Sequence, residues 1–167
     1  QYPRIALRLD QMPDSPINDR VLTSSKDKSH YRCLTLTSLA DGIKENRFLG
    51  SIAVVSLEPP VSQPGPLTDL SADYELTMEK AADVISSYLE MFAAGVPGHW
   101  QLGDAKGGFL CTNNGLRALL KLLKELISFI EFKNHLQAYT LDADQIIEKI
   151  TPYVKPLVEF FQKATPE

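Results

Sequence analysis

The 167-residue sequence has only two cysteines, Cys33 and Cys111, and they form no CxxC pair. Secreted domains that depend on disulfides carry several closely spaced cysteines, whereas cytoplasmic proteins keep their thiols reduced. Each cysteine lies in a short apolar, strand-like segment, which favours a buried, reduced thiol over a catalytic one. The cysteine content therefore predicts a cytoplasmic protein.

Long apolar segments are also missing. No run of about eighteen apolar residues occurs, so we expect no membrane-spanning helix and no membrane partner. The first four residues are followed by no apolar stretch of a secretory signal. Because the chain does not begin with methionine and residues 4–9 already have the pattern of an ordered element, we expect a fragment of a longer protein or a processed product.

Complete catalytic and cofactor motifs are absent as well. His30, His99 and His135 lie in unrelated contexts without zinc-ligand spacing, so we expect no metal site. The sequence contains no phosphate-binding P-loop, no dinucleotide-binding fingerprint and no GxSxG elbow. We therefore expect no cofactor and no catalytic residue, and an enzyme is the least favoured class of function.

Charge is unevenly spread along the chain, which has a net charge of −4. Residues 1–50 carry eight Lys and Arg against six Asp and Glu, whereas residues 51–105 carry one lysine against eight acids. Phosphate binding needs clustered cations, so the first third is the more favourable nucleic-acid surface. The basic residues that we consider there for phosphate contacts are Arg4, Arg8, Arg20, Lys26, Lys28 and Arg32.

The first third predicts a mixed α/β lobe over residues 1–57. Residues 4–11 have helical spacing, and the prolines at 13 and 16 block continuation. Residues 32–36 alternate as a strand does, and Thr37 or Ser38 would then cap a helix through about residue 46. Residues 58–70 hold four prolines, which predicts a surface loop and the only candidate boundary between subdomains.

The second part, residues 71–167, predicts a helical domain. Apolar residues recur at helical spacing over residues 73–94 and, as a wide leucine-rich stripe, over 114–132. We expect the second of these helices to be the core helix, enclosed on more than one side. A last helix begins near Asp142 or Asp144 and should be interrupted at Pro152 and Pro156. The fold class is thus mainly α, with a few short strands in the N-terminal third and at 109–112.

The glycine-rich segment 100–109 leads to the N-terminus of the core helix. Helix N-termini offer free N–H groups to anions, so a phosphate or nucleic-acid contact here is one interpretation. Its candidate residues are Lys106, Gly107, Gly108, Asn113 and Arg117. The favoured alternative is a turn that glycine permits, followed by a helix cap. We expect a positive φ at Gly107 or Gly108, and a side-chain cap from Thr112, Asn113 or Asn114. Trp100 should lie in the core.

Three stretches, in this order, resemble the C-terminal half of DGQHR-domain proteins, a prokaryotic family that includes DndB-type regulators of DNA phosphorothioation. The stretches are Ile5–Leu9 with Asp14-Ser15-Pro16 and Asp19-Arg20-Val21, then residues 34–39, then Trp100 and Gly103 followed by residues 107–115 and the leucine-rich helix. The defining Asp-Gly-Gln-His-Arg motif is absent from this sequence and would lie upstream of residue 1. The resemblance implies an intracellular, DNA-linked role near modification or defence systems.

Two functional hypotheses follow. In the first, the chain is a non-catalytic region that assists DNA binding or its regulation. In the alternative, it is an interaction or oligomerisation module whose leucine-rich surface docks on an N-terminal part of its own protein or on a second copy. The excess of apolar residues over 116–130 favours the alternative.

Overall fold

A computed structural model describes residues 1–50 and 64–164, and within them the chain is almost entirely helical. The α-helices are α1 (Tyr2–Gln11), α2 (Leu36–Glu45), α3 (Tyr74–Gly95), α4 (Pro97–Leu102), α5 (Asn113–Asn134) and α6 (Ala143–Ala164). Two short 3-10 helices, η1 (Ser25–Asp27) and η2 (Ala138–Thr140), lie between them. The prediction of a mainly α fold is confirmed.

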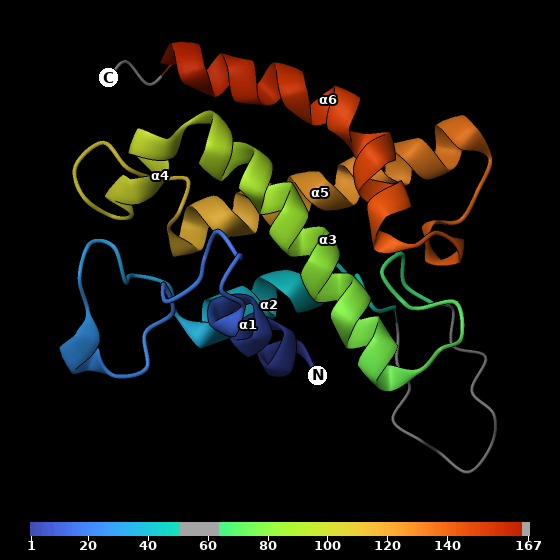
Figure 1. The fold of residues 1–167 in the computed structure, drawn as a ribbon, viewed down its shortest axis with the longest axis horizontal. Helices are drawn as coiled ribbons and strands as arrows, with labels where there is room; N and C mark the ends of the chain where they lie inside the picture. Colours follow the sequence, from blue (N-terminus) through green and yellow to red (C-terminus); the bar gives the residue numbers. More distant parts are fainter. Residues whose placement is uncertain (51–63, 165–167) are drawn as a thin grey trace.

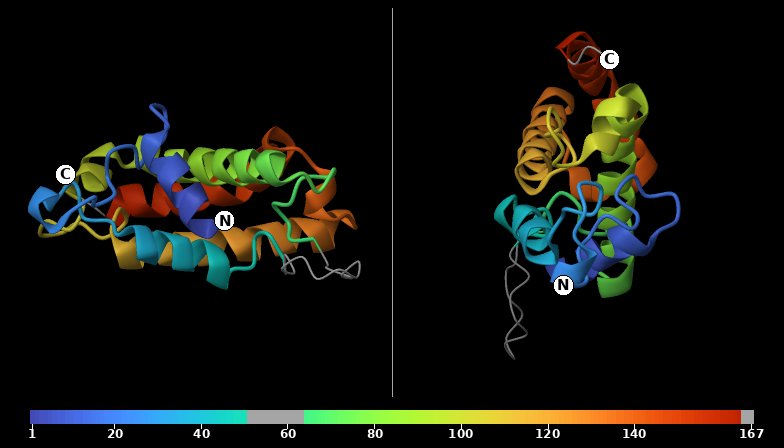
Figure 2. Two further views of the ribbon diagram at one scale, coloured as in Figure 1. Left: turned by 90° about the horizontal axis from the view of Figure 1, so that it is seen from below. Right: turned by 90° about the vertical axis from the view of Figure 1, so that its left-hand side faces the viewer.

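The helices form three layers (Figures 1 and 2). The long helices α3 and α5 lie in the middle, α1 and α2 pack on one side of them, and α6 covers the other side. Helix α1 contacts α2 and α3, while α6 contacts α3 and α5. The middle layer is therefore enclosed by helices from both ends of the sequence.

Helix α5 is the core helix, as its leucine-rich stripe predicts. It contacts α2, α3 and α6. Its fully buried or nearly buried residues are Leu116, Leu119, Leu120, Leu123, Ile127 and Ile130. Burial of each such side chain stabilises the fold by roughly 1.5–3 kcal/mol. The same hydrophobic cluster extends from Ile5 in α1 to Val154 in α6.

Side-chain caps begin the long helices. The Asp73 side chain accepts a hydrogen bond from the Leu76 amide at 2.9 Å, at the start predicted for α3. Helix α2 begins two or three residues earlier than predicted, because Thr35, not Thr37 or Ser38, is its cap. The backbone amide of Thr35 donates to the Asn113 side chain at 2.9 Å, which holds Thr35 extended before the helix.

The predicted strand at residues 32–36 is wrong. Its place is taken by an isolated parallel bridge between Val21 and Leu34, in which the Leu22 amide donates to the Leu34 carbonyl at 2.7 Å. The pairing cannot extend into a ladder, because Leu36 already begins α2. A strand needs several consecutive paired residues, and this segment supplies one.

The predicted strand at 109–112 is wrong as well, because these residues turn into the cap of α5. The Thr112 hydroxyl donates to the Phe109 carbonyl at 2.6 Å and accepts from the Gly115 amide at 3.1 Å. Both local expectations for this region are confirmed: Thr112 caps the helix, and Gly107 has a φ of 89°. Trp100 is buried, as expected, and lies in α4.

Helix α6 is continuous, so the interruption predicted at its two prolines is wrong. Pro152 and Pro156 are four residues apart and both lie on the exposed side, where the carbonyl groups they leave without a donor meet water. The opposite side buries Ile146, Ile150 and Val154 against the middle layer. This burial offsets a cost of about 3 kcal/mol for each proline.

The end of the proline-rich segment is anchored to the fold. Residues 58–63 lie outside the described part of the chain, so the proposed boundary at 58–70 stays a prediction. The described end of this segment is not a free surface loop, because Leu67 is buried and its amide donates to the Phe48 carbonyl at 2.9 Å. Gly65 lies so close to Gly50 that a Cβ there would come within 2.0 Å of the Gly50 nitrogen.

Lys80 of α3 joins this segment to η2. Its buried ammonium donates to the carbonyl oxygens of Thr68 at 2.9 Å, Tyr139 at 3.2 Å and Ala138 at 3.4 Å. Burial lowers the pKa of this group. The three acceptors satisfy the three donors of the ammonium, so one side chain holds two irregular segments on α3.

We expect Lys80→Met to lower the free energy of unfolding by roughly 2–4 kcal/mol, because three buried carbonyl groups lose a charged donor. Urea denaturation followed by circular dichroism measures this change. Lys44→Met, at an exposed lysine of α2, is the matched control and should change the free energy by less than about 0.5 kcal/mol. Equal stability of the two variants would contradict the role assigned to Lys80.

Candidate functional site

Two loops that are distant in the sequence meet at one end of the molecule. The loop between α1 and α2 and the loop between α4 and α5 lie side by side on the left in Figure 1 and in the left view of Figure 2. The Asp104 amide donates to the His30 carbonyl at 3.1 Å, and the Asp104 carboxylate lies 2.8 Å from His30 Nδ1. Gly103 permits this approach, since a Cβ there would lie 1.8 Å from the His30 carbonyl oxygen.

Three lysines project from these two loops. Lys26 and Lys28 belong to the first loop and Lys106 to the second, and all three are exposed. Within residues 1–50 and 64–164, none of the three side chains makes an ion pair or a hydrogen bond. The surface formed by these lysines with His30 and Tyr31 is called the basic end below.

Arg20 lies beneath this surface and is fully buried. Its guanidinium donates to the Trp100 carbonyl at 3.0 Å and to the Tyr31 carbonyl at 3.4 Å. The Trp100 indole in turn donates to the Pro16 carbonyl at 2.9 Å. Arg20 therefore ties α4 to the first loop, and the sequence hypothesis that it contacts phosphate does not fit an internal position.

The other arginines predicted as phosphate contacts have carboxylate partners. Arg4 lies 3.1 Å from Glu75, Arg8 lies 3.4 Å from Glu79, and Arg32 lies 2.8 Å from Asp19. The first two pairs join α1 to α3. Exposed pairs of this kind contribute roughly 0–1 kcal/mol each, so their main effect is to neutralise the arginines.

The residues predicted for an anion site at the start of α5 also have internal partners. Asn113 accepts from the Thr35 amide, and one Arg117 nitrogen contacts both Glu45 carboxylate oxygens at 2.6 and 2.7 Å. Gly108 packs against the Gly103 carbonyl, which a Cβ would approach to 2.4 Å. Lys106 has no such partner among the described residues, and it joins the basic end.

His30 and Tyr31 also belong to this surface, although no sequence motif predicts them as site residues. Their signal is an aromatic residue interleaved with cations, in the order Lys26, Lys28, His30, Tyr31, Arg32. Such interleaving is typical of surfaces that combine phosphate contacts with stacking.

A groove with basic residues lies between α2 and α5 and has a volume of about 460 Å³. Lys121 and Lys124 line it beside Arg117, at the i, i+4 and i+7 spacing of one helix face. Glu45 and Glu125 line it too and offset two of the three positive charges. The basic end, where lysines lack carboxylate partners, is therefore the better candidate for anions.

Cys33, Cys111 and His99, which lie near these loops, are all buried. The Cys33 thiol donates to the Cys111 carbonyl at 3.4 Å, and burial raises the pKa of both thiols, that of Cys111 to about 12. Burial lowers the pKa of His99, whose Nε2 accepts from the Phe109 amide at 3.4 Å. Over residues 1–50 and 64–164, no three His, Cys, Asp or Glu side chains are grouped to hold a metal ion.

No family model, curated protein or solved structure matches the chain. In the parts of the chain that the structure describes, no helix has the length and apolar character to cross a membrane.

We expect Cys111 to react with Ellman's reagent at least 100-fold more slowly in the folded protein than in guanidinium chloride, and Cys33, whose pKa burial also raises, to react more slowly in the folded protein too. With a pKa of about 12, the thiolate fraction of Cys111 at pH 8 is roughly one in ten thousand. Absorbance at pH 8 measures the rate, and the denatured sample, which should release two equivalents per chain, is the control. Fast reaction of one thiol in the folded state would identify a reactive cysteine and contradict this assignment.

Proposed function

We propose that this chain is a non-catalytic helical region that assists nucleic-acid binding, and that the basic end is its contact surface. The observation that carries the proposal is the meeting of the two loops, which places Lys26, Lys28 and Lys106 at the same end of the molecule without carboxylate partners. Long, exposed lysines of this kind neutralise phosphates and release the counterions that surround a nucleic acid.

The net charge of −4 does not oppose this role, because most of the acids lie outside the two loops that carry the free lysines. The carboxylates of Glu75 and Glu79 are directed toward α1, and that of Glu45 toward α5. At the basic end, the Asp104 carboxylate contacts His30, and the Asp27 carboxylate accepts hydrogen bonds from the hydroxyls of Thr23 and Ser24. A phosphate there meets lysines whose charge no ion pair cancels.

We further propose that the setting is that of DGQHR-type proteins, in the regulation of a prokaryotic DNA-modification or defence system. Support comes from the three stretches that carry the resemblance, because they contact one another in space. Val21 pairs with Leu34, Thr35 bonds to Asn113, and Arg20 bonds to Trp100. Motifs that meet at one place are expected when they build one shared site or one shared core.

We expect the chain to bind a fluorescently labelled oligonucleotide at about 50 mM salt, and affinity to fall steeply as salt rises. Replacing Lys26, Lys28 and Lys106 by alanine should weaken binding and lower the slope of log affinity against log salt by about 2, because about 0.7 counterions per single-strand phosphate contact are no longer released. Fluorescence anisotropy measures both quantities.

The matched control replaces three exposed lysines on α2 and α6, Lys44, Lys155 and Lys163, by alanine. It makes the same change in net charge and should leave the slope almost unchanged. Absence of binding by the wild-type chain, or an equal loss in the two triple variants, would remove the basic end as the nucleic-acid surface.

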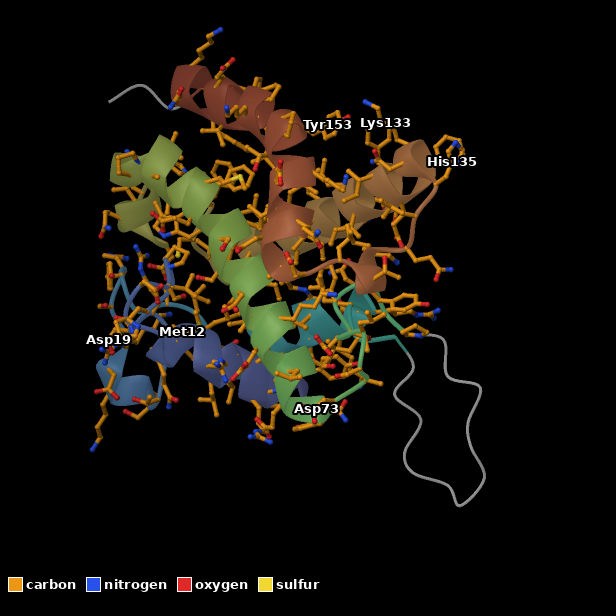
Figure 3. The ribbon with its side chains drawn as sticks, turned by 45° about the vertical axis from the view of Figure 1, so that its right-hand side comes forward. Met12, Asp19, Asp73, Lys133, His135 and Tyr153 are labelled. Atoms are coloured by element: carbon orange, nitrogen blue, oxygen red, sulfur yellow. The ribbon has the colours of Figure 1, made fainter. Side chains whose placement is uncertain are left out.

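A second candidate function is docking on a second copy through an aromatic surface of α5 and α6, which consists of Phe129, Phe132 and Tyr153. Phe132 is 80% exposed and Phe129 is 45% exposed. Phe129 meets Tyr153 edge to face at 5.1 Å, and the Tyr153 hydroxyl lies 2.6 Å from the Lys133 ammonium (Figure 3). The leucine-rich surface predicted for docking is covered by other helices, so these aromatic residues replace it.

If this surface joins two copies, the mass from sedimentation equilibrium should rise from one chain to two with concentration, and Phe132→Ser should return it to one. Phe132 is highly exposed, so the substitution should leave thermal stability nearly unchanged. Phe160→Ser, at a 62% exposed residue near the other end of α6, is the control and should not change the mass. A wild-type monomer at all concentrations excludes this candidate.

A further inference from the structure

Tyr31, which belongs to the basic end, is held in place by Arg20. The residue is 42% exposed, yet the guanidinium carbon of Arg20 lies only 3.7 Å from the centre of its ring. The same guanidinium donates to the Tyr31 carbonyl at 3.4 Å. The buried Arg20 guanidinium therefore contacts both the ring and the backbone carbonyl of Tyr31.

The guanidinium itself has no freedom to move away. Arg20 is fully buried, its Nη2 is bound to the Trp100 carbonyl, and in the described residues no carboxylate neutralises it. Its Nε atom is buried without an acceptor. A buried cation without an anion is costly, so the electron-rich face of the Tyr31 ring is an important part of its solvation. This requirement fixes the ring in place.

A ring that is fixed on one face and exposed to solvent is a preorganised platform for stacking. An exposed tyrosine in a loop ordinarily samples several rotamers and loses that freedom when it binds a ligand. Here Arg20 has already ordered the side chain, which reduces the entropic cost of stacking a planar ligand on the ring. Lys28 lies three residues earlier, and the contact between Asp104 and His30 brings the second loop, with Lys106, beside it.

We propose that Tyr31 stacks on an unpaired base and that the target is therefore a single-stranded nucleic acid, with Lys26, Lys28 and Lys106 on its phosphates. This inference rests on the proposed function and specifies its ligand. In a duplex the base faces are already stacked within the helix, whereas single strands present them to aromatic side chains. Arg20 is a positioning residue that acts through the Tyr31 ring.

The test compares three labelled probes of equal length: a single-stranded oligothymidine, an abasic strand with the same backbone, and a duplex. We expect the wild-type chain to bind the oligothymidine most tightly. Tyr31→Ala should weaken that binding roughly 10-fold and leave binding to the abasic strand unchanged, because a base-stacking contact is lost and phosphate contacts are not. Tyr31→Phe should retain the wild-type preference.

The matched control is Tyr74→Ala. Tyr74 is 38% exposed and also lies beside an arginine, with the guanidinium carbon of Arg4 at 5.3 Å from its ring centre, but it belongs to α3 and not to the two loops. It should not change the affinity for any probe. Tyr31→Trp adds a spectroscopic readout, because its fluorescence should be quenched when oligothymidine binds and not when the abasic strand binds.

The outcomes separate the two proposals. If the chain binds oligothymidine and Tyr31→Ala has wild-type affinity, or if the duplex is preferred, the stacking platform is overturned and the lysine surface stands. If no probe binds at low salt, both proposals fail. Tyr31→Ala could also be less stable than the wild type by circular dichroism. In that case, its binding of the abasic strand still shows whether the phosphate contacts are intact. Fluorescence quenching of Tyr31→Trp by oligothymidine then shows whether the residue at position 31 stacks on a base.

Discussion

The burial of α5 between α2, α3 and α6 is the constraint on which the rest of this structure depends. One helix with apolar residues on more than one face cannot be covered by a single neighbour, so it draws helices from both halves of the chain around it. The approach of α2 is close because Gly42 has no side chain, and a Cβ there would lie 3.0 Å from Leu120 Cδ1. Packing of α6 on the middle layer keeps this helix continuous although it contains two prolines.

This packing also decides which charges are available. Because α1 lies against α3, its arginines meet the acids of the most acidic part of the sequence and are neutralised. Because α2 lies against α5, Arg117 meets Glu45 in the same way. The cations that remain without partners among the described residues include those on the two loops at one end. The unpaired cations of the candidate site therefore lie on irregular segments that rigid helices hold in place.

Arg20 links the fold to that surface. A buried guanidinium is hard to satisfy, and here Arg20 contacts the Tyr31 carbonyl, the Tyr31 ring and the carbonyl of Trp100, a residue 80 positions later in the sequence. The arrangement orders a loop that has almost no regular structure of its own. Arg20 is buried and does not itself reach the surface, yet through these contacts it positions Tyr31 at the basic end.

The sequence by itself determined the features that depend on near neighbours in the chain. The spacing of apolar residues specified the long helices α3 and α5. The sequence also narrowed the cap of α5 to residues 112–114, of which Thr112 is the cap, and the positive φ to Gly107 or Gly108, of which Gly107 has it. These are short-range effects of helix period, cap chemistry and backbone sterics.

Only the tertiary structure decided the partners of each charge, the loss of the two expected strands and the persistence of α6 through Pro152 and Pro156. It also decided the site, since His30 and Asp104 meet across 74 residues of sequence. The physical reason is that burial and ion pairing depend on which helices pack together, and the periodicity of one segment carries no information about its partner. Arg20 and Lys28 are both basic residues of one loop, yet packing buries the first and leaves the second in water.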